Sequence, residues 1–263
     1  MNQSLPDIAF FHELANLASQ ETLPRFRSNL DNPVETKPKE GFRFDPVTAA
    51  DRNAERVMRE LITQRYPDHA IQGEEFGFSG EGPIRWVLDP VDGTRPFLCG
   101  LPIWGTLIGL LHDERAVMGM MSQPYTSECF WADGVRAWMR NRHGEKQLET
   151  RKGIVLEQAI LHTTAPEAVA MNPAVNFAEL TRQTLMTRYG GECYAVSMLA
   201  AGCIDICVEF GLQPYDIVAL IPIVEQAGGV ITDINGQRAE SGGTVVATGC
   251  PALHEQVLRV LNG

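Results

Sequence analysis

The stretch RWVLDPVDGT, residues 85–94, places two carboxylates on a bend directly after an apolar run. Residues 86–88 are large and apolar and predict a short buried strand. Pro90 cannot donate to a β-ladder, so we expect the strand to stop at Asp89. Asp92 begins an Asp-Gly-Thr turn that can open a helix with its N–H groups available. Such a bend suits a divalent cation or a phosphate, although the local pattern fits a plain turn equally well.

The size and charge of the chain limit the class of protein. Its 263 residues, 44% of them hydrophobic, suit one large domain or two closely packed halves that bury most of their apolar surface. The 22 basic and 33 acidic residues give a net charge of −11, which disfavours non-specific binding to nucleic acid or to anionic membranes. A phosphorylated substrate would therefore need something other than net charge to neutralise it.

The sequence also predicts a cytoplasmic location. The N-terminal residues show no basic region leading into an apolar one, and no apolar run approaches the ~20 residues that span a bilayer. The six cysteines form no C-x-x-C pair and lie mostly in apolar runs, which favours buried reduced thiols over disulfides or a zinc site. We expect a protein that binds neither membrane nor nucleic acid.

Hydrophobic periodicity divides the chain near residue 150. Before that point we expect helices over 7–28 and from Thr48 to Tyr66, with a polar loop between them. Consecutive short strands at hairpin spacing then predict an antiparallel sheet, at 70–72, 86–88, 103–111, 116–122, 128–132 and 137–140. We expect residues 1–263 to form a single catalytic unit of two packed halves, at about 1–150 and 151–263.

Beyond residue 150, strands alternate with helices. This alternation predicts a more parallel second sheet. The expected strands are 159–162, 204–209, 230–234 and 245–248. The expected helices are 166–171, 176–186, 193–202, 252–261 and a long apolar helix over 214–227, which Pro222 should interrupt.

Four separate segments carry acids where a strand ends or a helix begins: Asp51, Glu74 with Glu75, Asp89 with Asp92, and Asp216. Adjacent side chains of an extended segment point to opposite sides, so only one of Glu74 and Glu75 can face a given site. Taken singly, each acid has an ordinary explanation. Asp51 and Asp216 would complement helix dipoles, and Glu74 and Glu75 would be exposed loop acids.

The joint arrangement of these acids resembles a known family. The motifs DPVTAAD (45–51), GEE (73–75), DPVDGT (89–94) and PYDIVALIPIVEQAGG (214–229) occur in this order. Together they are similar to the inositol monophosphatase superfamily of metal-dependent, lithium-sensitive phosphatases, over nearly the whole chain. The resemblance implies an α-β-α-β-α layered sandwich, with an antiparallel N-terminal sheet and a mixed, more parallel C-terminal sheet. It also implies a site between the sheets and a homodimer.

Carried over by position, the motifs assign the site residues. The implied metal ligands are Glu74, Asp89, the carbonyl of Val91, Asp92 and Asp216. They would hold two to three Mg²⁺ ions, with Mn²⁺ as an alternative and Li⁺ as an inhibitor. The implied catalytic residues, which position and activate a water for in-line attack on phosphorus, are Asp51, Thr94 and Glu74. Cations are needed because each uncompensated carboxylate would repel a unit charge about 4 Å away by about 4 kcal/mol.

The residues after DGT separate the branches of this superfamily. Here the sequence RPFLCGLPIWGT, 95–106, resembles the histidinol-phosphatase branch, in which DGT-R-x-F precedes G-L-P-x-W-G-T. GECYA at 191–195 and LQPYD at 212–216 also resemble that branch, while the inositol branch usually has Trp at the place of Tyr215. Pro96 and Cys99 depart from the expected pattern, so the pocket for the alcohol part of the substrate is the least defined part of the site.

The expected substrate contacts are Gly93, Thr94, Arg95 and Glu209. Backbone N–H groups of Gly93 and Thr94 would bind phosphate oxygens. Because L-histidinol carries an ammonium and an imidazole, an acid is expected near them. Glu209 would bind the amino end, and its alternative is a solvated strand-end acid. Arg95 would either orient the phosphate or pair with a neighbouring acid.

We therefore predict a phosphoric monoester hydrolase that converts L-histidinol phosphate to L-histidinol and phosphate in histidine biosynthesis. The alternative substrate is inositol 1-phosphate or another small sugar phosphate. An alternative of another class is a regulatory or binding member of the superfamily whose activity is dispensable. The chain shows no basic cluster for such a role, and it retains every metal ligand of the motifs.

Overall fold

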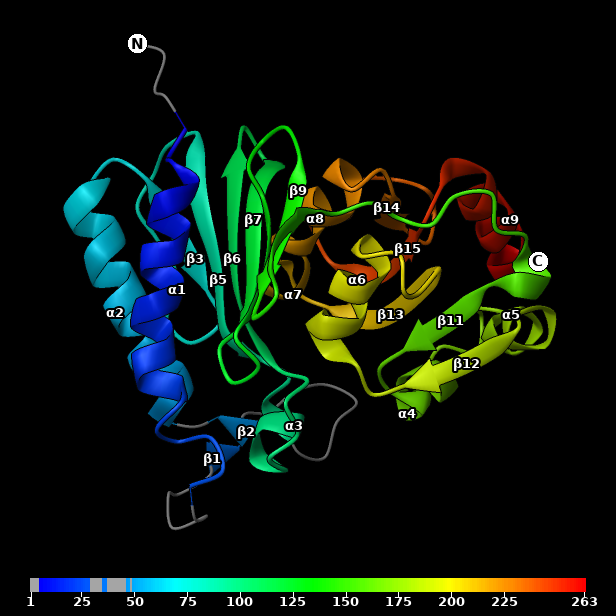
Figure 1. The fold of residues 1–263 in the computed structure, drawn as a ribbon, viewed down its shortest axis with the longest axis horizontal. Coiled ribbons are helices and arrows are strands. Elements are labelled where there is room, and N and C mark those ends of the chain that lie inside the picture. Colours follow the sequence, from blue (N-terminus) through cyan, green and yellow to red (C-terminus); the bar gives the residue numbers. More distant parts are fainter. Residues whose placement is uncertain (1–4, 29–34, 37–45, 48) are drawn as a thin grey trace.

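The computed structural model describes residues 5–28, 35–36, 46–47 and 49–263 of the chain. Its layers alternate helix, sheet, helix, sheet, helix across the longest dimension of the molecule (Figure 1). The larger sheet has eight strands and the smaller has five. The layered α-β-α-β-α architecture expected from the sequence is therefore present.

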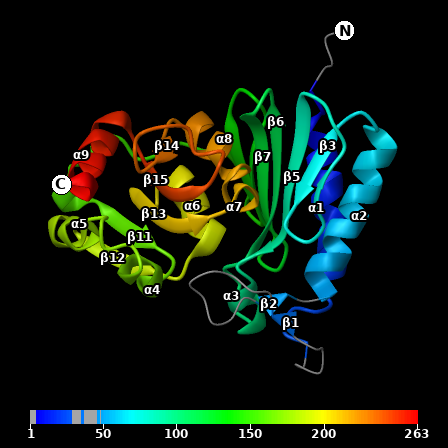
Figure 2. The same ribbon diagram turned by 180° about the vertical axis from the view of Figure 1, so that it is seen from behind.

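The first layer is a pair of helices, α1 (Ile8–Thr22) and α2 (Ala49–Arg65), on the outer face of the larger sheet (Figure 2). The side chain of Asp7 caps α1 by accepting a hydrogen bond from Ala9 N–H at 2.9 Å. Apolar residues of both helices pack on the sheet, and the rings of Phe11 and Trp86 lie 4.9 Å apart. The expected N-cap of α2, Thr48, lies outside the described residues.

The larger sheet has the strand order β10-β9-β8-β7-β6-β5-β3-β4. Its strands are β3 (Ala70–Gly73), β4 (Gly77–Ser79), β5 (Ile84–Asp92), β6 (Gly105–His112), β7 (Arg115–Gln123), β8 (Glu128–Ala132), β9 (Ala137–Asn141) and β10 (Gly144–Gln147). Neighbouring strands are antiparallel, except that β3 and β5 are parallel. A separate antiparallel pair joins β1 (Glu35–Thr36) and β2 (Pro46–Val47).

Strand β5 runs past the point where we expected it to end. It continues through Pro90 to Asp92, and its pairing with β6 shifts register between Asp89 and Asp92. A bulge of this kind accommodates a proline, because the missing N–H falls where the ladder is already interrupted. The Thr106 hydroxyl donates to the Pro90 carbonyl at 2.8 Å and ties the bulge to β6. The two aspartates of the bend therefore lie on a braced strand.

The smaller sheet is mixed and has the order β12-β11-β13-β15-β14. Strand β11 is parallel to β12 and to β13, whereas β15 is antiparallel to β13 and to β14. The strands are β11 (Ile160–Thr163), β12 (Met186–Tyr189), β13 (Ile206–Leu212), β14 (Val230–Asp233) and β15 (Gly243–Thr248). Its outer face carries α4 (Pro166–Ala170), α5 (Phe177–Gln183), α9 (Pro251–Asn262) and the 3₁₀ turn Leu156–Gln158 (Figure 1).

The middle layer consists of α6 (Glu192–Ala200), α7 (Pro214–Ile217) and α8 (Leu220–Gln226), and a further short helix, α3 (Thr94–Leu98), follows β5. The helix expected over 214–227 breaks at Val218 and Ala219, and not at Pro222. Pro222 lies in the first turn of α8, where a missing N–H costs little. The break rests on the larger sheet, since a Cβ placed on Gly119 would lie only 2.0 Å from the Ala219 carbonyl oxygen.

All six cysteines are free, as expected, but only Cys193 and Cys207 are buried, and Cys99 and Cys203 are exposed. Within the described residues, no helix combines the length and the apolar character needed to cross a membrane. A buried apolar cluster includes residues of the larger sheet, the middle helices and the smaller sheet, so the two sheets share one core.

Candidate active site

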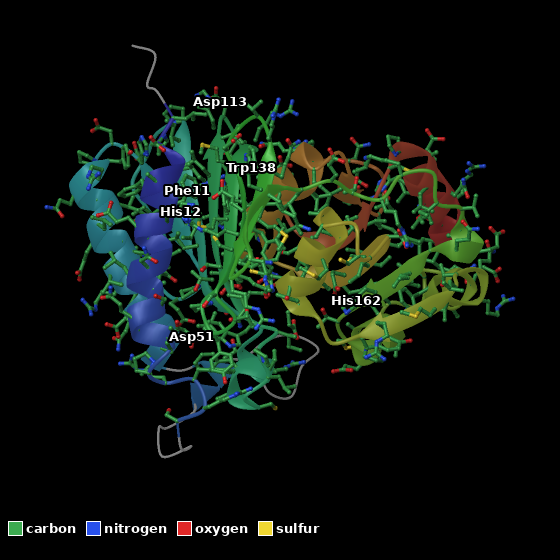
Figure 3. All side chains as sticks on the ribbon, viewed as in Figure 1. Phe11, His12, Asp51, Asp113, Trp138 and His162 are labelled. Carbon is green, nitrogen blue, oxygen red and sulfur yellow. The ribbon has the colours of Figure 1, made fainter. Side chains whose placement is uncertain are left out.

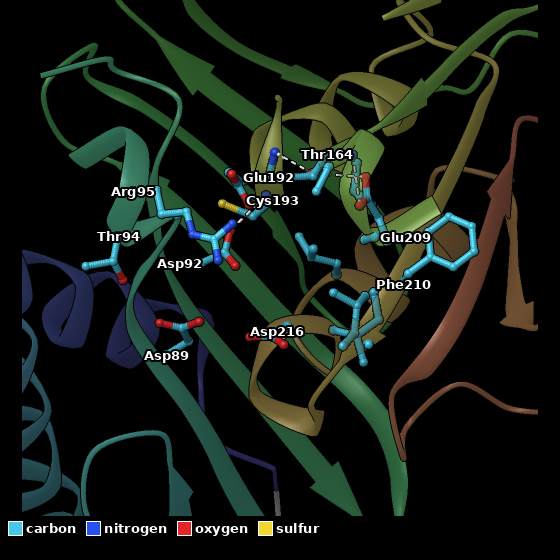
Figure 4. A pocket seen from close by; sticks show the side chains of 18 of the residues that line it. Asp89, Asp92, Thr94, Arg95, Thr164, Glu192, Cys193, Glu209, Phe210 and Asp216 are labelled. Atoms are coloured by element: carbon cyan, nitrogen blue, oxygen red, sulfur yellow. Dashed lines mark hydrogen bonds between the residues drawn. The ribbon is translucent and has the colours of Figure 1, made fainter. Parts of the chain in front are cut away.

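A cavity of about 140 Å³ opens where the two sheets approach each other. Residues from β5, α3, α6, β13 and α7 line it, together with residues of α4 and the loop before it (Figure 4). Of the predicted site residues, it brings together Glu74, Asp89, Val91, Asp92, Gly93, Thr94, Arg95, Glu209 and Asp216. Asp51 is the one that does not line it.

Three aspartates from distant parts of the chain converge in this cavity. Carboxylate oxygens of Asp89, Asp92 and Asp216 lie within 4.8 Å of one another. Each is held by a backbone N–H. Val91 N–H donates to Asp89 at 3.1 Å, Cys193 N–H donates to Asp92 at 2.8 Å, and Gln213 N–H donates to Asp216 at 2.6 Å. The last bond belongs to a capping box at the start of α7.

Glu74 and Glu75 turn to opposite sides of the chain after β3. Glu74 lines the cavity, and its N–H donates to the Leu88 carbonyl of β5 at 3.2 Å. The carboxylate of Glu75 lies 3.7 Å from the Arg52 guanidinium, with its side chain only 1% exposed. Glu74 is therefore the residue of this pair that faces the aspartates.

The carboxylates of the cavity repel one another. The pKa of the Asp89 carboxyl is raised well above its usual value because it is fully desolvated and because Glu74, Asp92, Asp216 and Asp51 repel its charged form. A cation bound among these acids would favour their ionised forms. The donors are all carboxylate oxygens, which hard divalent cations prefer, so the residues fit a divalent metal ion.

Of the three residues expected to position the attacking water, Glu74 and Thr94 line the cavity and Asp51 does not. Asp51 is buried in the first turn of α2 (Figure 3), and it acts on Asp89 through its charge. Thr94 begins α3, and its hydroxyl donates to the Val91 carbonyl at 3.2 Å. Gly93, between β5 and α3, adopts a left-handed φ of 81°, which turns the chain sharply from the strand into the helix.

Glu209 lies at the far side of the cavity from the bend of β5. It is only 8% exposed and sits within β13, so the alternative of a solvated strand-end acid is wrong. Its carboxylate accepts hydrogen bonds from Thr164 N–H at 3.0 Å and from the Thr164 hydroxyl at 3.1 Å. Burial raises the pKa of Glu209, and the His162 imidazole 3.6 Å away and the hydrogen bonds from Thr164 partly oppose this shift.

The lining residues that the sequence-based set missed include two that bond to each other, Thr164 and Glu192. Glu192 begins α6 with a left-handed φ of 47°, and its N–H donates to the Thr164 hydroxyl at 3.1 Å. Desolvation, with repulsion from Asp92 and Glu209, raises the pKa of Glu192 to about 8. In the sequence, GECYA (191–195) indicated only the resemblance to the histidinol-phosphatase branch. No local pattern shows that Glu192 lies close to β5 and β13.

Arg95 brings a cation to the same cavity. It follows Thr94 in α3 and lines the space between the bend of β5 and α6. Its guanidinium lies 3.8 Å from the exposed Glu167 carboxylate of α4. At this position Arg95 can either contact a phosphate or pair with an acid, as the sequence predicts.

The layered fold is shared with a known family of proteins. The model of the inositol monophosphatase family matches residues 6–262. The chain belongs to the inositol monophosphatase family. A solved inositol monophosphatase from Zymomonas mobilis superposes with a TM-score of 0.84 at 35% identity, over 96% of each chain.

Curated relatives of this family member include proteins named for histidinol phosphate. A histidinol-phosphatase from Streptomyces coelicolor is 33% identical over 100% of this chain and 99% of its own length. The bifunctional phosphatase IMPL2 of Arabidopsis thaliana is 39% identical over 83% of this chain, and the match spans 66% of that longer protein. The family and these relatives support a phosphoric monoester hydrolase that acts on small phosphorylated substrates.

Proposed function

We propose that this protein hydrolyses L-histidinol phosphate to L-histidinol and phosphate, as a step of histidine biosynthesis. The observation that carries the proposal is the buried Glu209 carboxylate, which lines the cavity opposite the aspartate cluster. A buried acid there would complement the ammonium group of a cationic alcohol. The full-length similarity to a protein named histidinol-phosphatase supports the same substrate.

The cluster would hold two to three Mg²⁺ ions, with Glu74, Asp89, the Val91 carbonyl, Asp92 and Asp216 as the ligands, and the convergence of the three aspartates supports this assignment. When bound, Mg²⁺ would neutralise the charge of the phosphate ester and activate the attacking water, and Li⁺ would compete for the same site. The chain's own residues orient the reactants. Because the Thr94 hydroxyl donates its proton to Val91, its lone pairs are left to accept a hydrogen bond from that water.

The remaining proposed contacts divide between the two ends of the substrate. The first turn of α3 starts at Gly93, where helix N–H groups lack partners within the helix, and Gly93 and Thr94 would hold phosphate oxygens there. Asp51 would orient the water together with Thr94. Glu209 would bind the ammonium of histidinol, so that the ester bond lies between the two ends of the cavity.

The second candidate substrate is inositol 1-phosphate. The similarity to the Zymomonas mobilis inositol monophosphatase favours it. In that case Glu209 would accept hydrogen bonds from hydroxyl groups instead of an ammonium. The same metal and phosphate contacts would serve both substrates, so only the alcohol side of the cavity separates these candidates.

The test is phosphate release from L-histidinol phosphate and inositol 1-phosphate, measured side by side with Mg²⁺. We expect kcat/KM to be at least about tenfold higher for L-histidinol phosphate, since a charge-assisted contact adds about 1.5–3 kcal/mol. Asp89→Asn should abolish both reactions while the fold is retained. A large preference for inositol 1-phosphate would reverse the order of the candidates. A folded wild-type protein that hydrolyses neither ester would favour the regulatory or binding role.

We also propose a homodimer, which the family resemblance implies. Light scattering coupled to size-exclusion chromatography measures the mass directly. A mass near twice the 29.0 kDa of the chain is expected, and a monomer would contradict it.

A further inference from the structure

The alcohol side of the cavity contains two carboxylates, and the proposed reaction uses only one of them. Glu209 comes from β13 and Glu192 from the start of α6, on opposite sides of the loop that carries Thr164 (Figure 4). Both line the same space as the aspartate cluster. The role of Glu192 is therefore open once Glu209 has been assigned to the ammonium group.

Thr164 links the two acids. Its hydroxyl accepts a hydrogen bond from Glu192 N–H at 3.1 Å and donates to the Glu209 carboxylate at 3.1 Å. Its own N–H donates to the other oxygen of Glu209 at 3.0 Å. This network fixes the backbone of Glu192 relative to the carboxylate of Glu209, so the spacing of the two acids is built into the fold.

The side chain of Glu192 lies against Gly93, where the alcohol side of the cavity meets the turn after β5. A Cβ placed on Gly93 would lie 3.0 Å from Glu192 Cγ and 3.3 Å from its Cβ, so the two residues are in close contact. Glu192 keeps a left-handed φ of 47°, which is unfavourable for a residue with a side chain. Packing and hydrogen bonds impose this conformation and aim the side chain into the cavity that it lines.

The acids around Glu192 outnumber the positive residue beside it, so a further cation would be attracted there. Asp92 and Glu209 repel its ionised form, and Arg95 is the positive residue that acts on it. Apolar side chains complete this end of the cavity, among them Ala168, Leu212 and Leu220. An alcohol with an apolar ring and a second basic nitrogen matches this combination of acids and apolar walls.

We infer that Glu192 is a second specificity-determining carboxylate, which selects phosphate esters whose alcohol carries two basic nitrogens. Glu209 holds one nitrogen and Glu192 receives the N–H of the other, for histidinol that of the imidazole ring. The inference rests on the proposed function, because it concerns the alcohol side of the same site. A competing role is structural, with Glu192 holding Arg95 in place through its charge.

The test compares three phosphate esters that differ in the number of basic nitrogens. L-Histidinol phosphate has two, phosphoethanolamine has one, and glycerol 2-phosphate has none. For Glu192→Gln we expect kcat/KM to fall about 10- to 100-fold for L-histidinol phosphate, with little change for the other two esters. Glu209→Gln should lower the values for both nitrogen-containing esters. Glu192→Asp, which keeps the charge, should recover part of the loss.

Glu167→Gln is the matched control. It removes a carboxylate beside Arg95 from a residue that does not line the cavity, so its substrate ratios should equal those of the wild type. Circular dichroism and thermal unfolding confirm that each variant is folded. Equal losses for all three esters in Glu192→Gln would overturn the inference and favour the role on Arg95. An unchanged preference would also overturn it, whereas a wild type inactive on L-histidinol phosphate would refute the proposed function instead.

Discussion

At the scale of single residues, the site is a set of acids whose charges oppose folding unless something compensates them. Asp89 is fully buried beside three other cavity carboxylates and Asp51, and Glu192 and Glu209 add two more at the alcohol side. Desolvation raises the pKa of Asp89, Glu192 and Glu209, and repulsion by neighbouring acids adds to this shift for Asp89 and Glu192. The cluster is therefore kept for its chemistry, and it costs stability in the protein without metal.

The pH dependence of stability follows from Glu192. Its pKa of about 8 in the folded protein lies above the usual value of 4.5 for a glutamate. The folded state therefore binds a proton that the unfolded chain has lost, and this stabilisation disappears as the pH rises from 4.5 to about 8. In metal-free protein, we expect Glu192→Gln to match the wild-type Tm near about pH 5. Above about pH 8, the Tm of Glu192→Gln should exceed the wild-type Tm by about 3–6 °C. Thermal unfolding in EDTA measures both values.

The control for this experiment is Glu255→Gln, which changes an exposed glutamate of α9. Its Tm difference from the wild type should be the same at both pH values. If Glu192→Gln behaves in the same way, the environment of Glu192 does not disfavour its charge, and the electrostatic account of this side of the cavity is wrong.

At the scale of elements, two irregularities position the aspartates that we propose as metal ligands. The bulge in β5 lies between Asp89 and Asp92, and the break after α7 follows Asp216 by two residues. The break is seated on Gly109 of β6 and Gly119 of β7, which are register partners in the sheet. Two glycines side by side thus let the chain between α7 and α8 approach the sheet backbone.

This contact predicts graded effects of adding a methyl group. Gly119→Ala would place a Cβ 2.0 Å from the Ala219 carbonyl oxygen, so the backbone must move. At Gly109 the close atoms are a Val218 methyl at 2.8 Å and Ala219 N at 2.9 Å, and part of this clash can relax through a side chain. We expect Gly119→Ala to cost about 3 kcal/mol or more in unfolding free energy and Gly109→Ala about 1–3 kcal/mol. Equal or negligible losses in denaturant unfolding would contradict the contact.

The elements also show what sequence patterns can and cannot predict. Strong periodicity located α2, the start of α1 and the strands β6 to β9 to within a few residues, although α1 ends at Thr22 and not at the expected residue 28. β10 and β12 were missed because they are short edge strands with no buried face to produce an alternating pattern. The site residues on motifs were brought together by the fold, whereas Thr164 and Glu192 reach the cavity only through tertiary contacts. The break at Val218 depended on the facing glycines, which no local rule reveals.

At the scale of the whole molecule, the acid cluster joins the two sheets. Asp89 and Asp92 belong to the larger sheet, and Asp216 belongs to a helix of the middle layer that follows the smaller sheet's β13. A cation shared by the three would therefore stabilise the contact between the two halves of the chain as well as the site. Binding to the folded state alone raises stability by about 2.7 kcal/mol at a metal concentration about 100 times the Kd.

Thermal unfolding with and without Mg²⁺ tests this coupling. We expect saturating Mg²⁺ to raise the wild-type Tm by about 5–10 °C, since about 1 kcal/mol corresponds to roughly 2–4 °C in a chain of this size. Asp216→Asn keeps an oxygen to accept from Gln213 N–H but removes a negative charge. Its Tm without metal should equal or exceed that of the wild type, and its response to Mg²⁺ should fall by more than half. Asp233→Asn, at a turn outside the cavity, should keep the full response. A shift of the same size in Asp216→Asn would mean that the stabilising ion binds elsewhere, because a cation held between the sheets must lose affinity when one of its three aspartates is neutralised.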